Sequence, residues 1–151
     1  MANVLKISEA ASLALHTMVL LAANPGRRMS IRQVASMLHA SQAHLAKVLQ
    51  RLVKVGLANS TRGPKGGFTL AKRPNLISLL DVYEAIDGPL GTPECLLGTP
   101  VCDGTSCILG GLLEATNRQF RTYMAAARLS DLTGVYRGQP PRHNHGGTGR
   151  H

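Results

Sequence analysis

The three cysteines, which are the residues of this chain best suited to metal or redox chemistry, lie close together in an otherwise cysteine-free sequence. Cys95, Cys102 and Cys107 occur in the stretch PECLLGTPVCDGTSCILGG, which is interrupted by glycine and proline. Their spacing, Cys-x6-Cys-x4-Cys, lacks the close cysteine pair and the fourth ligand of most structural zinc sites. Three cysteines also cannot all pair within one chain, which argues against a secreted disulfide framework.

Two kinds of chemistry are favoured for these thiols. Three thiolates on one loop suit an iron–sulfur cluster whose remaining ligand is not sulfur, and such a cluster is comparatively easy to oxidise or displace. A thiol–disulfide switch would use the same residues without a metal. Zinc binding and inert thiols are the less favoured alternatives, because inert cysteines are usually buried in a core element rather than placed on a loop.

The basic residues of the chain are concentrated in one segment. The 151-residue chain has a formal net charge of +9. Between Pro25 and Arg73 there are ten Lys or Arg side chains and no Asp or Glu, whereas all eight acidic residues lie outside this span. Ordinary solvated surfaces mix both signs of charge, so this segregation predicts contact with a polyanion.

The same basic segment has the pattern of two short helices followed by a hairpin. Ser30 and Gln33 form a capping box at the start of SIRQVASML. Ser41 caps SQAHLAKVLQRLVKVG, in which leucines and valines form one face while polar and basic side chains recur on the other. Two short strands, LANST and GFTLA, then flank GPKGG, which is typical of a turn.

This order of elements is typical of a winged helix-turn-helix, whose second helix enters the major groove of DNA. Side chains near the N-terminus of that helix reach base edges, later ones meet phosphates, and the wing lies beside the adjacent minor groove. We therefore expect base contacts from Ser41, Gln42, His44 and Lys47, phosphate contacts from Arg51 and Lys54, and wing contacts from Arg62 and Lys65.

The remaining elements are also helical. The first helix, ISEAASLALHTMVLLAAN, begins after Ser8 and is apolar on most faces, so we expect it to be buried or shared between subunits. An amphipathic helix, ISLLDVYEAIDG, precedes the cysteines, and a last long helix runs from about residue 108 to residue 132. We predict a mainly α fold with a small β-hairpin wing.

Other classes of protein are disfavoured. No stretch approaches the roughly 20 apolar residues of a membrane span, and the apolar segment 10–23 lacks a signal-peptide cleavage pattern. We therefore expect a cytoplasmic protein without a membrane partner. No nucleophile–base pair, carboxylate dyad or phosphate-binding glycine loop supports catalysis, so we do not expect an enzyme. An iron–sulfur electron-transfer protein is a less favoured alternative.

The wing RGPKGGFTLAK, the helix ISLLDVYEAIDG and the three-cysteine loop before a long helix together resemble the Rrf2 family of bacterial transcription regulators, over about residues 5–134. The resemblance implies a homodimer that binds a palindromic operator in double-stranded DNA. It also implies that Cys95, Cys102 and Cys107 hold an iron–sulfur cluster, with 2Fe–2S favoured over 4Fe–4S. The expected function is a repressor that senses redox state, nitric oxide, or iron–sulfur or iron status. A cluster-free regulator based on thiol–disulfide chemistry is the alternative.

With this resemblance the chain divides into five parts. The expected divisions are a winged helix-turn-helix domain at 1–74, a connecting helix at 75–92, a cysteine loop at 93–111, a long dimerisation helix at 112–136 and a disordered tail at 137–151.

The chain departs from the family pattern at the fourth cluster ligand. IscR-like members have a histidine three residues after the last cysteine, where this chain has Gly110. NsrR-like members use a carboxylate from the first helix of the partner subunit, and Ser12 aligns there. We expect His16, one turn further on, as the ligand, with Glu9 as the other candidate. Ala46 replaces the glutamate with which IscR-like proteins discriminate sites, so the operators need not be the same.

Overall fold

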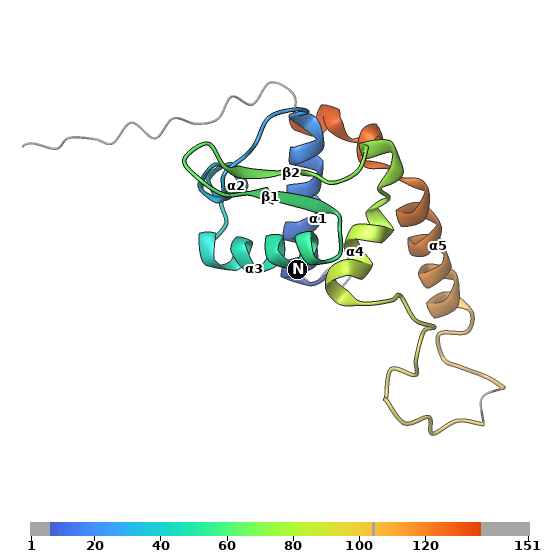
Figure 1. Cartoon of the computed structure of the whole chain (residues 1–151). Helices are drawn as coiled ribbons and strands as arrows, with labels where there is room; N and C mark the ends of the chain where they lie inside the picture. Colours follow the sequence, from blue (N-terminus) through green and yellow to red (C-terminus); the bar gives the residue numbers. More distant parts are fainter. Residues whose placement is uncertain (1–6, 104, 137–151) are drawn as a thin grey trace, which may run out of the picture.

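The fold is mainly helical with one two-stranded antiparallel hairpin, which confirms the predicted fold class (Figure 1). The structure is a computed structural model that describes residues 7–103 and 105–136, so the tail predicted at 137–151 lies outside the described residues. The main elements are α1 (Glu9–Ala23), α2 (Ile31–Leu38), α3 (Gln42–Lys54), β1 (Ala58–Thr61), β2 (Gly67–Leu70), α4 (Leu79–Asp87) and α5 (Leu112–Ala126).

Serine side chains cap the first four helices. Ser8 and Ser41 each accept a hydrogen bond from a main-chain N–H in the first turn of α1 and α3. Ser30 and Ser78 form complete capping boxes at α2 and α4. Each cap satisfies a donor that the helix itself cannot pair. The helix starts predicted at Ser8, Ser30 and Ser41 are therefore confirmed.

Helix α1 lies in the middle of the core, as its apolar sequence predicts. It packs against α2, α3 and α4, and Met18 and Leu20 are completely buried. Leu45 and Leu49 on the inner face of α3 join the same core. Burial of one such leucine contributes about 1.5–3 kcal/mol relative to exposure. This core sets the position of α3, whose opposite face is left to solvent.

The wing includes a third backbone segment besides β1 and β2. The N–H of Met29 donates to the carbonyl of Phe68 at 3.1 Å, and the N–H of Phe68 donates back to the carbonyl of Met29 at 2.8 Å. Gly67 has a φ of 149°, and a Cβ added there would lie 2.7 Å from the carbonyl oxygen of Met29. Glycine is therefore required at Gly67, where the segment before α2 pairs with β2.

The helices on both sides of the cysteine loop are shorter than expected. Only Leu79–Asp87 of the predicted connecting segment 75–92 forms an α-helix, and Gly88, with a φ of 83°, ends it. The last helix begins at Leu112 rather than at about residue 108, because the preceding residues belong to the loop. It also ends at Ala126, so the prediction of a helix reaching 132–136 was wrong.

Long-range pairing with the start of α4 ends α5. The N–H of Leu79 donates to the carbonyl of Ala127, and the N–H of Leu129 donates to the carbonyl of Ile77, both at 3.0 Å. Leu129 is completely buried. These contacts outweigh the local helix propensity. The chain continues as two short 3-10 turns, both of which pack against α1.

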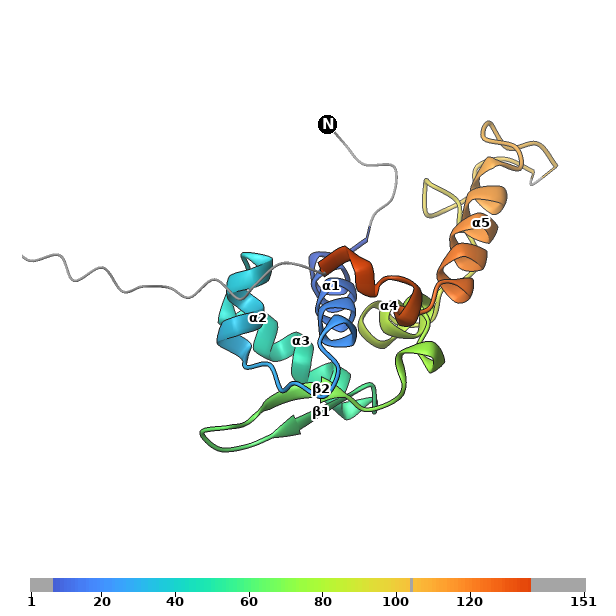
Figure 2. The same ribbon diagram turned by 90° about the horizontal axis from the view of Figure 1, so that it is seen from above.

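The cysteine loop projects away from the helical body. Figures 1 and 2 show it beyond the N-terminal end of α5, clear of the wing and of α3. Every described residue from 91 to 108 is exposed.

None of the helices in the described ranges has the length and apolar character that a membrane span requires.

Candidate DNA-binding surface and cysteine loop

The N-terminal end of α3 presents most of the side chains predicted to read bases. Ser41, Gln42 and Lys47 are exposed. The Ser41 hydroxyl accepts a hydrogen bond from the main-chain N–H of His44 at 3.3 Å, so this hydroxyl also caps the helix. The His44 ring is about one-third exposed, and its Nδ1 lies 3.9 Å from a carboxylate oxygen of Glu9. The structure thus places His44 beside α1, whereas the other three face solvent.

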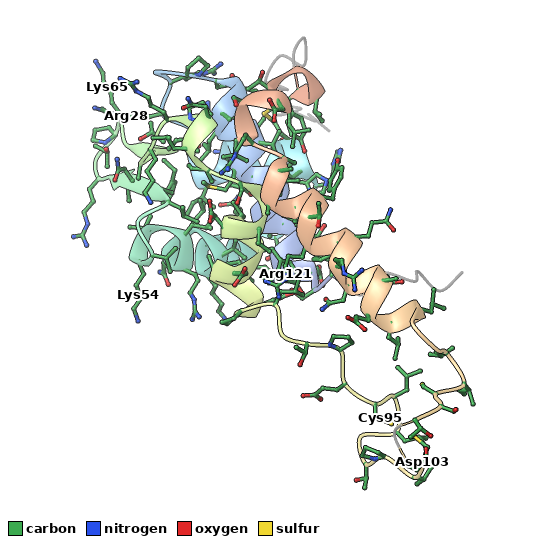
Figure 3. All side chains as sticks on the ribbon, turned by 90° about the vertical axis from the view of Figure 1, so that its right-hand side faces the viewer. Arg28, Lys54, Lys65, Cys95, Asp103 and Arg121 are labelled. Atoms are coloured by element: carbon green, nitrogen blue, oxygen red, sulfur yellow. The ribbon has the colours of Figure 1, made fainter. Side chains whose placement is uncertain are left out.

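The two residues predicted to contact phosphates differ in their surroundings. Lys54 is exposed and points away from the body of the molecule in Figure 3. Arg51 is also exposed, but its Nε donates to the carbonyl oxygen of Ala85 on α4 at 3.0 Å. Part of the Arg51 guanidinium therefore joins α3 to α4, a role that the sequence did not reveal.

The wing carries its predicted cations at the surface. Arg62 and Lys65 are both exposed in the turn between β1 and β2. Arg28 joins them from the segment before α2, since its Nη1 donates to the carbonyl of Lys65 at 3.4 Å. Arg28 was not predicted at this position, because the contact spans 37 residues of sequence.

The three cysteines are free and exposed. The N–H of Gly98 donates to the carbonyl of Cys95 at 2.9 Å, and the N–H of Gly110 donates to the carbonyl of Cys107 at 2.8 Å, so two of them begin tight turns. Beside Cys102, hydrogen bonds from the hydroxyl and the N–H of Thr105 hold the pKa of Asp103 below its usual range. The loop is thus organised by local turns rather than by packing.

The comparison with protein families covers nearly all of the described chain. The family model named Rrf2, an iron-dependent transcriptional regulator, matches residues 7–134. The chain belongs to the Rrf2 family. NsrR of Shouchella clausii is 31% identical over 121 residues, which are 78% of this chain and 81% of that protein. The relatives are transcriptional regulators and not enzymes, as expected.

Solved structures agree with this assignment. CymR, the global cysteine regulator of B. subtilis, superposes with a TM-score of 0.74 at 25% identity, covering 87% of this chain and 98% of CymR. IscR of T. potens gives a TM-score of 0.69 at 20% identity, covering 93% and 95% of the two chains. The winged-helix fold of this Rrf2 chain is therefore that of known regulators.

The cysteines of this Rrf2 chain fit an iron–sulfur cluster by donor type but not by their present placement. Three exposed thiols can become thiolates without leaving a packed core, and thiolates are the usual ligands of such clusters. Within residues 7–103 and 105–136, however, no group of three or more His, Cys, Asp or Glu side chains is placed to hold a metal ion. Cluster binding would require the loop to draw its thiols together.

His16 is exposed on α1, and its Nδ1 lies 2.7 Å from the carbonyl oxygen of Ser12. This contact leaves the other ring nitrogen available for a ligand. Glu9, the other candidate, is also exposed and lies beside His44. Neither is brought together with the cysteines of the same chain into a metal-binding group among the described residues.

Two side chains on α5, neither of which was predicted, hold the stem of the cysteine loop. Asn117 donates from Nδ2 to the carbonyl of Gly91 at 3.0 Å. Arg121, one turn later, donates from Nη2 to the carbonyl of Leu90. The rings of Tyr83 on α4 and Phe120 on α5 meet edge to face, with centroids 5.4 Å apart. The loop therefore leaves the body from a defined junction of α4 and α5.

Proposed function

We propose that this Rrf2 regulator binds an operator as a homodimer and represses transcription when its cysteine loop holds an iron–sulfur cluster. Its winged helix is that of DNA-binding transcription regulators. The observation that carries the proposal is the exposed cationic surface of α3 and the wing, to which Lys47, Lys54, Arg62 and Lys65 contribute. No acidic residue interrupts the sequence from Pro25 to Arg73. Such a surface attracts the phosphate backbone and positions α3 in the major groove.

The surface of α5 supports homodimerisation. Met124 is the one buried residue of this helix, whereas Leu112 and Tyr123 have exposed fractions of 59% and 63%. Pairing with α5 of a second copy would cover these apolar side chains and set the distance between two recognition helices. A palindromic operator matches that two-fold symmetry.

Cys95, Cys102 and Cys107 would hold the cluster, with 2Fe–2S favoured. The description of the family as iron-dependent supports this assignment, and the bound cluster would supply sensitivity to oxidants and nitric oxide. His16 of the partner subunit is the proposed fourth ligand, since His16 is exposed on a helix that lies apart from the cysteine loop (Figure 1). If the three thiols gathered around a cluster, the stem of the loop would be displaced, and α4 and α5 would move with it.

A thiol–disulfide switch is the second candidate, favoured by the three free and exposed thiols. Two of these thiols would form one S–S bond, and a peroxide would accept the two electrons and two protons released. The similarity to CymR of Staphylococcus aureus, which has been solved in an oxidized form, supports the same alternative.

Anaerobic purification, followed by measurement of iron, acid-labile sulfide and visible absorption per monomer, tests the cluster. Matched iron and sulfide with absorption between roughly 320 and 460 nm support it. The Cys102→Ser variant is expected to lose iron, and His16→Ala is expected to alter the spectrum while leaving the three thiolates. Absence of iron after reconstitution in the presence of iron and sulfide would exclude the cluster and favour the thiol switch.

The DNA half of the proposal needs its own measurement. Operator duplexes selected from a random library are expected to bind the cluster-loaded protein more tightly than the cluster-free protein, by 5- to 150-fold, which corresponds to about 1–3 kcal/mol of coupling. Equal affinity of the two forms would refute regulation through the loop. A protein that binds no duplex in either form would refute the whole proposal.

A further inference from the structure

The backbone holds Arg28 beside the wing. The mutual hydrogen bonds of Met29 and Phe68 fix the segment before α2 along β2. Gly67 keeps the two backbones in close contact, since a side chain there would collide with Met29. Arg28 precedes Met29, so these backbone hydrogen bonds alone hold the Cα of Arg28 at the edge of the hairpin.

The side chain of Arg28 reaches the turn of the wing. Its Nη1 donates to the carbonyl oxygen of Lys65 at 3.4 Å. Figure 3 shows Arg28 and Lys65 at one edge of the molecule, at the end opposite to Cys95 and the cysteine loop. The contact therefore links the segment before α2 to the turn of the wing.

Most of the hydrogen-bonding capacity of Arg28 remains unused. A guanidinium carries five N–H donors, and within the described residues only the bond to Lys65 involves this side chain. No described carboxylate forms an ion pair with Arg28. Arg28 is exposed and contacts Lys65, and both Lys65 and Arg62 of the same turn are exposed cations. An exposed guanidinium without an internal anion is suited to bind a phosphate group.

We propose that Arg28 is a further DNA-contacting residue that also positions the wing. One N–H group holds the carbonyl of Lys65, and the other N–H groups bind a backbone phosphate next to the groove that the wing enters. This inference rests on the proposed binding of DNA by α3 and the wing. It adds the segment before α2 to the DNA-binding surface, which otherwise consists of α3 and the hairpin turn.

The test compares Arg28→Met with Arg27→Met in the full-length protein. Both changes remove one exposed positive charge from adjacent positions, but only Arg28 makes a described side-chain hydrogen bond to the wing. The probe is a roughly 30-base-pair duplex, about three helical turns, selected with the wild-type protein. Arg28→Met is expected to weaken binding about fivefold and to lower the magnitude of the salt slope by about one. Arg27→Met should change the logarithm of the affinity by less than half as much as Arg28→Met does.

A second readout needs no DNA. Hydrogen exchange of the wing residues 62–68 in the free protein should become about twofold faster in Arg28→Met, because the carbonyl of Lys65 loses its donor. The same exchange should be unchanged in Arg27→Met. Arg28→Lys keeps the charge and should restore the salt slope, which would separate phosphate binding from a loss of folding.

Two outcomes would overturn the inference. One is wild-type affinity and salt slope in Arg28→Met. The other is an equal loss of affinity in both methionine variants with unchanged exchange in the wing, since this would indicate a general charge effect. Failure of the wild-type protein to bind any duplex would instead refute the proposed function, and the exchange experiment would still decide whether Arg28 positions the wing.

Discussion

Arg51 on α3 donates from Nε to the main-chain carbonyl oxygen of Ala85 on α4, at 3.0 Å. Three residues after Ala85, Gly88 turns the chain toward the stem of the cysteine loop. At the last residue of α4, the hydroxyl of Ser8, the N-cap of α1, donates to a carboxylate oxygen of Asp87 at 2.6 Å. The last turn of α4 thus contacts both α3 and the start of α1, shortly before the cysteine loop.

Arg51→Ala should reduce the effect of the loop on DNA affinity. The variant loses the link to α4, so we expect the ratio of DNA affinities between the cluster-loaded and cluster-free forms to fall severalfold. The free energy of unfolding should fall by only about 0.5 kcal/mol, because Arg51 is exposed. Fluorescence anisotropy with a selected duplex measures the ratio. Lys54→Ala is the control, since it should lower affinity equally in both states. An unchanged ratio in Arg51→Ala would show that α3 responds by another route.

Removing the stem contacts should free the cysteine loop while leaving the fold intact. The double variant Asn117→Ala, Arg121→Ala lacks both donors to the carbonyls of Leu90 and Gly91. We expect faster hydrogen exchange in the segment preceding Cys95 and a weaker response of DNA binding to the loop. The matched control is Arg118→Ala, which removes a surface ion pair with Glu114 on the same helix and should change neither quantity. Unaltered exchange in the double variant would contradict a clamping role.

Gly67→Ala should destabilise the wing and the domain. The new Cβ would lie 2.7 Å from the carbonyl of Met29 at a φ of 149°, so the strain should be about 1–3 kcal/mol. A loss of this size should lower the melting temperature by several degrees, at about 2–8 °C per kcal/mol. Gly134→Ala has open space around its Cβ and should melt within about 1 °C of wild type. Equal melting of the two variants would mean that the Met29 segment can move aside.

Tyr83 should make stability fall at alkaline pH. Burial, followed by the negative charges of Asp87 and Glu84, raises the pKa of Tyr83 above its ordinary value of 10.0. The folded state therefore holds this proton more tightly than the unfolded state. The resulting stability is complete below the unfolded pKa and is lost as pH rises through the folded pKa. Denaturant unfolding between about pH 8 and pH 11 should show a shallower alkaline decline in Tyr83→Phe than in the exposed control Tyr123→Phe. Identical declines would refute this role.

Thr17→Val should stabilise the protein. Thr17 is completely buried, and among the described residues its hydroxyl has no hydrogen-bond partner. Valine has nearly the same shape without the polar atom, so we expect a gain of about 1 kcal/mol in the free energy of unfolding. Thr17→Ser keeps the hydroxyl and loses a methyl group, so it should destabilise. A lower free energy of unfolding in Thr17→Val would indicate that the hydroxyl is satisfied in solution.

The sequence by itself determined the winged helix and the identity of its solvent-facing cations. Helix starts at Ser30 and Ser41 depend on bonds within a single turn, and the hairpin depends on the glycines of its turn, so both can be recognised locally. The grouping of Cys95, Cys102 and Cys107 on one loop could be predicted in the same way. Local pattern also showed which face of α3 is apolar and hence which face is left exposed to solvent.

Only the tertiary structure decided where α5 ends and what several of the cations contact. The end of α5 depends on pairing with Ile77 and Leu79, and the bond of Arg28 to Lys65 crosses 37 residues. The link from Arg51 to Ala85 crosses 34 residues in the same way. Each of these contacts joins segments that are distant in the chain, and no local propensity or spacing encodes which segments will meet. They form because burial of the shared core brings the helices and the wing together.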